Sequence, residues 1–594
     1  MPTPTSDLTG EWRRLALAVL RKSGRAGAGD DPAVVDRLLA TVTEDDIVIP
    51  PLFTPDTVVE PAGEPGAAPF TRGGRPPGDR TGWDIRQRHD LGDPASPAAA
   101  ARDVDGGVTS LWLPGTDPQR LAELLENTGP ARTGVVLQGG AAGPALAAVW
   151  LDTAARRGVA DTALHGNLGA DPLGDRARGT AAPPWAAVAD LARRCAGSLP
   201  GVRAVVADAM PYHWAGATDA QELGYSLATA VAYLRALTDA GMPAAEAASQ
   251  IEFRYAATTD EFLTIAKLRS ARRLWTRVQE ACGITPSAQR QHAVTSGRTT
   301  TTRHPWANLP RATLACFGAV VGGADAITVR PFDTGSETGA RAARLARNTH
   351  LLLREEAHLA RVADPAGGAW SVEWLTTALA HRAWEWFTGV EAAGGMSEAL
   401  TSGRLERDLA TSWDRRAEDV RRGRRPVVGV SRYAAVGDEA SGTDPELSGR
   451  AGLPCRRDGQ QFEELRDRTD AFTRITGRRP AVLLVALGGA ASASRAMFAT
   501  DLFAAAGVTV ERVDDPDRAG ARLRETGLTV ACLAGDPDSY ELHAEKTAAL
   551  LAEAGARAVH AVGGCPPCAG VSAFTDGDDA VEVLRSLLTD LEIA

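Results

Sequence analysis

The spacing of apolar and polar positions divides this chain of 594 residues into stretches of different character. Residues 1–79 contain two helix-like patterns, followed by a run rich in Pro and Gly, PPLFTPDTVVEPAGEPGAAPFTRGGRPPGDR. Such a run cannot form a core of its own, so we expect an N-terminal arm that lies along another surface. Its apolar side chains at Ile47, Ile49, Leu52 and Phe53 predict that this surface belongs to a partner chain.

From Trp83 onward, short β-rich runs alternate with longer amphipathic helical patterns. This alternation predicts parallel strands joined by crossover helices, and eight such strands close a barrel. We therefore expect a TIM-type (β/α)8 barrel with its exit helices over residues 80–433. The eight strand candidates are WDIRQRH, GVTSLWLPG, TGVVLQGG, TALHGNLGA, GVRAVVADAM, QIEFRYAAT, RQHAVTSG and ADAITVRPFD.

The last part of the chain predicts a second, smaller domain. A charged, Gly-rich connection over residues 434–477 is predicted to be a linker. Residues 478–594 then contain four strand candidates separated by helical patterns: RPAVLLVALGG, GVTVERVDD, LTVACLAGD and ARAVHAVGG. This pattern is typical of a flavodoxin-like, doubly wound sheet, so the fold class of the whole chain is predicted to be α/β.

The overall composition excludes several function classes. With 44% hydrophobic and 23% charged residues, the chain has an ordinary globular composition. The net charge of −11 and the lack of a basic stripe argue against nucleic-acid binding. The N-terminus has no signal-peptide pattern, and no apolar stretch approaches the roughly 20 residues that span a bilayer. We therefore expect a cytoplasmic protein.

The turn after the first strand of the second domain is the first place to look for a ligand. Strand carboxyl ends and helix amino ends converge at such turns in open α/β sheets. Residues 488–494, GGAASAS, offer no carboxylate, imidazole, thiol or amine. The position favours ligand binding, whereas the residues lack most of the chemistry for it.

A pair of cysteines near the C-terminus is a second candidate. Cys565 and Cys568, in GGCPPCAG, have the spacing of a redox or half-zinc motif. A structural zinc ion needs four ligands, and neither a second pair nor a nearby His follows. Two buried, inert thiols are the favoured interpretation.

Two stretches of the barrel carry polar groups near strand ends. His165, Asn167 and Asp171 lie in HGNLGADPLG, where barrel enzymes keep catalytic groups, but the Gly, Asn and Pro content favours a simple turn. Residues 295–306, TSGRTTTTRHPW, offer hydroxyls and arginines to a phosphate of coenzyme A. The same composition is equally typical of a loop at solvent or at an interface.

Long stretches of the barrel and its exit helices closely resemble the cobalamin-dependent acyl-CoA mutases, methylmalonyl-CoA mutase in particular. The most specific are FRYAATTDEFLTIAKLRSARRLW, ARNTHLLLREEAHLARVADPAGGAWSVEWLTTALAHRAWEWFTGVEAAGGM and GRRPVVGVSRYAAV. Shorter pieces are GWDIRQRHD, AGATDAQELGYSLATAVAYLRALTDAG and QRQHAVTSG. In that family a barrel precedes a small cobalamin-binding α/β domain, so the C-terminal domain resembles a degenerate form of that fold.

In this family cobalamin is held by a lower axial histidine in a D-x-H-x-x-G motif at the turn of the C-terminal domain. The resemblance places Ala490 at the Asp position, Ser492 at the His position and Arg495 at the Gly position. Ala486 replaces a lysine ahead of the motif. Serine is a poor ligand, and alanine cannot orient one. The resemblance therefore implies that this chain binds no cofactor and no metal.

The family's active-site positions in the barrel are also altered. The active-site tyrosine falls on Gly78 and the catalytic histidine on Pro211, and neither residue can donate a proton from its side chain. His213 would share a strand face with Pro211, so it is a candidate for a displaced substitute. A hydrogen-bonded structural histidine is favoured, and no catalytic residue is expected in this chain.

The resemblance thus implies the small, non-catalytic subunit of a heterodimeric methylmalonyl-CoA mutase. The complex interconverts (R)-methylmalonyl-CoA and succinyl-CoA by a radical mechanism, with adenosylcobalamin in the large subunit. This chain is expected to dock on that subunit and stabilise it. Two alternatives stay open: a stand-alone acyl-CoA-binding protein, and a cobalamin-independent enzyme with a site rebuilt around His213 and residues 165–171.

Overall fold

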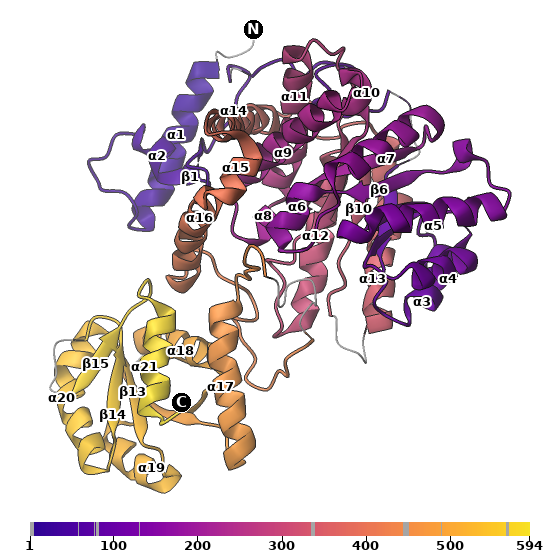
Figure 1. The fold of residues 1–594 in the computed structure, drawn as a ribbon. Helices are drawn as coiled ribbons and strands as arrows, with labels where there is room; N and C mark the ends of the chain where they lie inside the picture. Colours follow the sequence, from indigo (N-terminus) through magenta and orange to yellow (C-terminus); the bar gives the residue numbers. More distant parts are fainter. Residues whose placement is uncertain are drawn as a thin grey trace.

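The computed structural model contains an N-terminal hairpin of helices, a large barrel with exit helices, and a separate C-terminal domain (Figure 1). The C-terminal domain lies to one side of the barrel and is joined to it through the exit helices (Figure 1). The structure describes residues 5–57, 59–76, 78, 82–129, 131–333, 339–442, 451–488, 490–565 and 570–593.

Eight parallel strands form a closed barrel in chain order, and β10 pairs with β3 to complete it. The predicted TIM-type barrel is therefore confirmed, and each of the eight predicted runs contains one of its strands. The strands are β3 (Asp84–Arg88), β4 (Ser110–Pro114), β5 (Gly134–Gln138), β6 (Gly166–Ala170), β7 (Val202–Asp208), β8 (Ile251–Ala257), β9 (Arg290–Thr295) and β10 (Ala326–Thr328).

Helices surround the barrel and continue beyond it. The exit helix α14 (Trp370–Ala392) packs against α9 and α11. No helix in the described part of the chain is long and apolar enough to cross a membrane. The helices of the barrel and its exit are α3 (Ser96–Asp105), α4 (Pro118–Thr128), α5 (Gly143–Arg156), α6 (Pro172–Arg178), α7 (Trp185–Ser198), α8 (Met210–Trp214), α9 (Asp219–Asp239), α10 (Ala244–Ser249), α11 (Glu261–Ala281), α12 (Asn308–Val321), α13 (Gly339–Leu351), α15 (Gly395–Thr401) and α16 (Arg404–Arg421).

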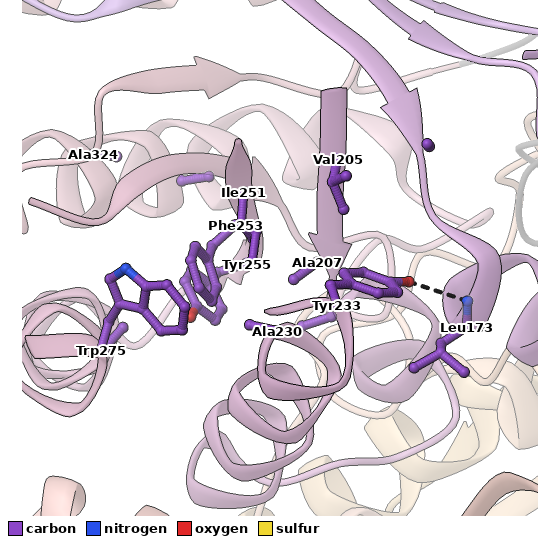
Figure 2. Packing of buried hydrophobic residues seen from close by; sticks show 14 of the residues in the cluster. Leu173, Val205, Ala207, Ala230, Tyr233, Ile251, Phe253, Tyr255, Trp275 and Ala324 are labelled. Carbon is purple, nitrogen blue, oxygen red and sulfur yellow. Dashed lines mark hydrogen bonds between the residues drawn. The ribbon is translucent and has the colours of Figure 1, made fainter. Parts of the chain in front are cut away.

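Strand β8 illustrates which side chains point outward to the helices and which point into the barrel. Successive strand residues point to opposite faces. Phe253 and Tyr255 point outward, and the Phe253 ring lies 5.0 Å from Trp275 of α11 (Figure 2). The alternate residues Glu252 and Arg254 therefore point into the barrel, where both are buried.

Aromatic side chains also connect the helices around the barrel. The main-chain N–H of Leu173 in α6 donates a 3.0 Å hydrogen bond to the Tyr233 hydroxyl of α9 (Figure 2). Tyr233 and Leu173 are both buried. This bond holds α6 beside α9 at the carboxyl end of β6.

The N-terminal arm folds back on its own chain. Helices α1 (Thr5–Lys22) and α2 (Val34–Leu39) share a small core separate from the barrel, and β1 (Thr41–Val42) pairs antiparallel with β2 (Val48–Ile49). Ile47 is buried in the barrel's own core, and the Phe53 ring lies 5.6 Å from Trp374 of α14. The prediction of a partner surface is therefore wrong for Ile47 and Phe53, because the barrel core and α14 cover them within the chain.

The C-terminal domain is a five-stranded parallel sheet in the order β12-β11-β13-β14-β15. This order is that of a flavodoxin-like sheet, so the predicted fold class is confirmed. The short β15 was not among the predicted strands. The strands are β11 (Ala481–Leu487), β12 (Thr509–Val513), β13 (Val530–Gly535), β14 (Ala558–Val562) and β15 (Val571–Phe574), and the helices are α18 (Ala490–Ala505), α19 (Ala519–Thr526), α20 (Pro537–Glu553) and α21 (Ala580–Asp590).

Part of the predicted linker forms a helix, α17 (Gln460–Thr476). Its buried Phe462 and Leu465 belong to the core of the C-terminal domain. The same helix also contacts the barrel domain, since Arg303 Nη1 lies 2.5 Å from Asp470 Oδ2 of α17. Helix α17 therefore connects the two domains by packing, while the exact domain boundaries remain predictions.

Candidate functional site

The inside of the barrel is filled by large side chains. Arg86 of β3 and Glu252 of β8 form a 2.6 Å ion pair between strands that are not neighbours, so the pair crosses the barrel. Above it, the Arg254 guanidinium lies 4.3 Å from the ring centre of Trp112 on β4. All four side chains are at most 3% exposed. These residues form a packed interior of ion pairs and rings.

The carboxyl-terminal mouth of the barrel is covered by residues 451–458, which we call the mouth strap. Its main chain binds the segments that follow β6, β7 and β9: N–H groups of Leu453, Arg456 and Asp458 donate to carbonyls of Ala177, Trp214 and Arg298, at 2.7, 3.0 and 3.0 Å. The Leu453 side chain is buried in the main core. The strap thus lies where barrel enzymes place their catalytic groups.

The Cys455 side chain of the mouth strap contacts a cluster at the top of the barrel interior. The cluster contains Trp112, Met210 and Trp214. Strap and interior therefore pack as one body over the carboxyl ends of the strands.

His213 occupies a fully buried position beside the mouth. Its Nε2 lies 2.7 Å from the Ser296 hydroxyl, and its Nδ1 lies 3.3 Å from Glu222 Oε2 without hydrogen-bond geometry. Glu222 is already bound by Lys267 at 2.9 Å. Burial, with Arg298 and Lys267 nearby, holds the pKa of His213 well below 6.5. The arrangement gives a neutral, enclosed imidazole that joins α8 to β9.

Pro211 lies on the same short helix as His213. It occupies the first turn of α8 and is buried. The expected strand-face relationship between the two residues does not occur, because both are helical.

The structure does not bring His165, Asn167 and Asp171 together as a reactive group. His165 is exposed, with Nδ1 3.3 Å from the Ala163 carbonyl. Asn167 is buried and binds main-chain groups of Val205 and Gly169 at 3.2 and 2.7 Å. The three residues therefore serve three different local contacts.

Asp171 belongs instead to a buried charge network that the sequence did not reveal. It caps α6 by accepting from Gly174 N–H, and it accepts from the Tyr233 hydroxyl at 2.5 Å. Arg178 lies 3.1 Å from Asp171 and also contacts Asp208, which in turn binds Arg254 at 2.7 Å. Burial raises the pKa of Asp171 to about 7. The network links the barrel interior to α6 beneath the mouth strap.

The turn of the C-terminal domain is occupied by its own side chains. The buried Ser492 hydroxyl donates to the Gly488 carbonyl. The Arg495 guanidinium donates to the Gly535 carbonyl at the end of β13 and lies against Gly563 after β14. Arg495 therefore covers the crevice at the carboxyl ends of these two strands. Ala490 begins α18, and Ala486 is buried in β11.

The remaining candidates are dispersed. Gly78 adopts φ +92° with open space where a side chain would start. Cys565 is half-buried, and Cys568 lies outside the described residues, so the predicted pair cannot be placed. Within the part of the chain that is described, no three His, Cys, Asp or Glu side chains are grouped to hold a metal ion.

The 295–306 loop forms contacts between the domains. Thr302 N–H donates to Glu463 of α17 at 2.6 Å, and Arg303, only 4% exposed, binds Asp467 and Asp470 of the same helix. Arg303 is therefore used for interdomain contacts, which agrees with the interpretation of this loop as part of an interface.

Comparison with known proteins agrees with the fold. Residues 118–471 match the methylmalonyl-CoA mutase family. The chain is 45% identical to the methylmalonyl-CoA mutase small subunit of Streptomyces virginiae, over 98% of this chain and 97% of that protein. It is 40% identical to a probable small subunit from Mycobacterium bovis, over 90% and 89% of the two chains. It is 36% identical to the small subunit of Propionibacterium freudenreichii subsp. shermanii, over 96% and 90%. The chain therefore belongs to the methylmalonyl-CoA mutase family, in the group of proteins named as its small subunit.

Proposed function

We propose that this chain is the non-catalytic small subunit of a heterodimeric methylmalonyl-CoA mutase. The complex interconverts (R)-methylmalonyl-CoA and succinyl-CoA, and its radical chemistry is supplied by adenosylcobalamin bound in the large subunit. This chain docks on the large subunit and stabilises it. We expect the complex to reside in the cytoplasm.

The filled barrel is the observation that carries this proposal. A coenzyme A thioester needs an open path to the carboxyl-terminal face, where barrel enzymes bind their substrates. Here the Arg86–Glu252 pair and the Arg254–Trp112 stack occupy the interior, and Leu453 of the mouth strap covers the face. Opening this path would separate Glu252 from Arg86 and leave the buried carboxylate without its ion-pair partner, at a cost of several kcal/mol.

The C-terminal turn supports the same proposal, because its residues do not fit a corrinoid. Ser492 offers a hydroxyl that is bound to the main chain, and Arg495 fills the crevice at the ends of β13 and β14. A lower axial ligand needs a neutral ring nitrogen held by a second group. The turn supplies neither.

The test is a direct comparison of the purified chain with and without a large mutase subunit. Equilibrium dialysis against adenosylcobalamin should show no stoichiometric retention by the chain alone. Methylmalonyl-CoA turnover should require the large subunit, and the two chains together should remain active for longer than the large subunit alone.

The alternatives give different outcomes in the same assays. A stand-alone acyl-CoA-binding protein would retain succinyl-CoA in dialysis without any partner. An enzyme rebuilt around His213 would turn over an acyl-CoA without cobalamin, and His213→Asn would abolish that turnover. Tight corrinoid retention by the isolated chain would contradict the proposed role.

A further inference from the structure

A cavity of about 410 Å³ lies between the N-terminal arm and the exit helices, away from the filled axis of the barrel. Its walls also include the connections after β7, β8 and β9. One wall is apolar and contains Ile49, Leu263, Val372 and Leu375. The cavity is therefore large enough for a small organic molecule with an aliphatic part.

Asp45, in the turn between β1 and β2, supplies a buried carboxylate to this cavity. The residue is 7% exposed, and its Oδ2 accepts a 3.1 Å hydrogen bond from Ala220 N–H. The charged groups that act on it most strongly, Asp219 and Glu44, are themselves acidic. Arg382 binds its main-chain carbonyl at 3.0 Å and not its carboxylate. A buried carboxylate among acidic groups lacks a counter-charge, which an organic cation in the cavity would supply.

The arginines around the cavity are already paired with other carboxylates. Arg416 binds both carboxylate oxygens of Asp458, at 2.7 and 2.6 Å, and Arg425 lies 2.6 Å from Glu44. Arg298 donates to two main-chain carbonyls, and Glu44 and Asp458 act on its charge. None of these arginines is left to pair with the carboxylate between β1 and β2.

The carboxylates around the cavity outnumber the cations. Lys267 lies 2.8 Å from Asp219 and 2.9 Å from Glu222, so one cation serves two carboxylates. Asp260 caps α11 and has no ion-pair partner in the described residues. The cavity therefore favours a positively charged ligand over an anion. The charged groups that line the cavity, with their ion-pair partners, are the carboxylates of Glu44, Asp45, Asp219, Glu222, Asp260 and Asp458 and the cations of Arg298, Arg416, Arg425 and Lys267.

The uncharged part of the lining indicates what kind of cation fits. An ammonium group has three N–H donors, and the hydroxyls of Thr41, Thr259 and Ser371 in the cavity wall offer further acceptors. A metal ion would leave the apolar wall uncovered, whereas an alkyl chain would cover it. The lining therefore matches an amine with an aliphatic chain.

We propose that this cavity binds a small aliphatic ammonium, with its charge on Asp45 and its chain against Val372 and Leu375. The site is distinct from the barrel axis and from the C-terminal turn, and the inference does not depend on the proposed mutase role. A ligand here would contact the N-terminal arm and the exit helices together.

The test uses the full chain and hexylamine as the probe, with ligand-observed NMR titration at pH 8 as the measurement. Hexylamine should bind saturably, whereas hexanoate, which has a chain of similar length and the opposite charge, should not. Asp45→Asn keeps an acceptor for Ala220 N–H and removes the charge, so it should weaken hexylamine binding at least tenfold. Ser371→Trp places a large side chain at a half-buried position in the wall. It fills the cavity without changing its charge and should weaken binding by the same factor.

The affinity for hexylamine should also depend on pH. Burial, with Asp219 and Glu44 nearby, raises the pKa of Asp45 to about 7. An alkylamine stays protonated from pH 6 to pH 8, as a lysine side chain does. Because the cation pairs with the ionised carboxylate, affinity should rise about tenfold from pH 6 to pH 8. This rise should be absent in Asp45→Asn.

Asp46→Asn is the matched control, because Asp46 lines a neighbouring cavity of about 440 Å³ and not this one, and is paired with Arg415. It should leave hexylamine affinity within twofold of the unaltered chain. Unchanged affinity in Asp45→Asn or in Ser371→Trp, equal binding of hexanoate, or no saturable hexylamine binding would each overturn the proposal.

Discussion

Single residues fill the two places where a ligand would be expected, the crevice of the C-terminal domain and the interior of the barrel. Arg495 is the clearest case, because its side chain reaches across the crevice and bonds the Gly535 carbonyl. Arg254 has a similar effect in the barrel, where it stacks on Trp112 and binds Asp208. In each case a long arginine side chain fills the space that a ligand would need. Its hydrogen-bond partners hold it there, because removing one partner alone would leave a buried polar group unpaired.

Restoring the cobalamin motif should not restore a mutase. The triple variant Ala490→Asp, Ser492→His and Arg495→Gly rebuilds only the C-terminal turn. In the proposed alignment Gly78 and Pro211 stand where the family's substrate site has its tyrosine and histidine, and groups that act as a unit fail together. Turnover of methylmalonyl-CoA by the triple variant alone should be undetectable.

Arg495→Gly alone is the control for the triple variant, because it opens the crevice without adding a ligand. Measurable turnover in the triple variant and none in this control would show that the substrate site is intact.

Asp45 should make the stability of the chain depend on pH. Burial, with Asp219 nearby, raises its pKa from 3.8 to about 7, although it accepts a hydrogen bond from Ala220 N–H. The folded state therefore holds a proton that the unfolded state has lost, so stability falls as pH rises from about 4 to 7. Asp45→Asn keeps the acceptor and removes the charge. It should raise the free energy of unfolding above pH 7 by at most about 4 kcal/mol.

Urea unfolding at pH 4 and pH 8 measures this effect, and the difference between the variant and the unaltered chain should appear only at pH 8. Asp46→Asn is the control, because the neighbouring Asp46 is half-exposed and its pKa is lowered by Arg415. An Asp45→Asn variant with the same stability difference at both pH values would contradict a raised pKa of Asp45 in the folded state.

At the scale of elements, the mouth strap is the segment that covers the carboxyl-terminal mouth of the barrel. Gly452 lies so near the main chain of Ala177 and Gly179 that an added Cβ would overlap it. Gly452→Ala should therefore displace the strap and destabilise the barrel by about 1–3 kcal/mol, as overpacking does elsewhere. Limited trypsin digestion followed by mass spectrometry should show faster cleavage after Arg456 and Arg457.

Gly437→Ala is the matched control in the same connection, since open space surrounds Gly437. It should leave the digestion rate unchanged. If Gly452→Ala is digested no faster than this control, the strap is not held by the close contact at Gly452.

At the scale of the whole molecule, the N-terminal hairpin has a small core of its own and an exposed apolar face. Leu8, Leu15 and Val19 lie on one face of α1 and are 56%, 64% and 65% exposed, whereas Leu17 and Leu20 pack on α2. An apolar helix face in this position is typical of a surface that contacts a partner. In the proposed heterodimer that partner is the large subunit.

We therefore expect a one-to-one complex with a large mutase subunit that survives size-exclusion chromatography. An obligate interface of this kind buries over roughly 2,000 Å². The double variant Leu15→Asp and Val19→Asp should weaken the complex at least tenfold, because it places two charges in an apolar contact. Deletion of residues 1–60 is a coarser test, since it also removes Ile47 and Phe53 from their contacts with the barrel core and α14.

Arg14→Ala is the control on another face of α1, where Arg14 is exposed. It should leave the affinity unchanged. Separate elution of the two co-expressed chains, or equal affinity in the double variant, would contradict the proposed contact.

The sequence by itself determined the barrel, the order of the two domains and most of their strands. Parallel strands covered by helices read as short apolar runs, so runs such as QIEFRYAAT and RPAVLLVALGG were recognisable without any tertiary information. β15 was missed because its four residues, VSAF, are partly exposed and form too short a run. Helix α17 was missed because its many charged residues are typical of a linker as well as of a surface helix.

Only the tertiary structure decided what the barrel contains and what closes it. Glu252 and Arg254 alternate with aromatic residues as they would on a solvent-exposed strand. Only barrel closure brings Glu252 to Arg86 and Arg254 to Asp208. Leu453 lies far along the chain from Ala177, so no local pattern predicts that residues 451–458 cover the mouth. The physical reason is the same in both cases: periodicity records which face of an element is apolar, whereas ion pairs and covering segments depend on which distant elements meet.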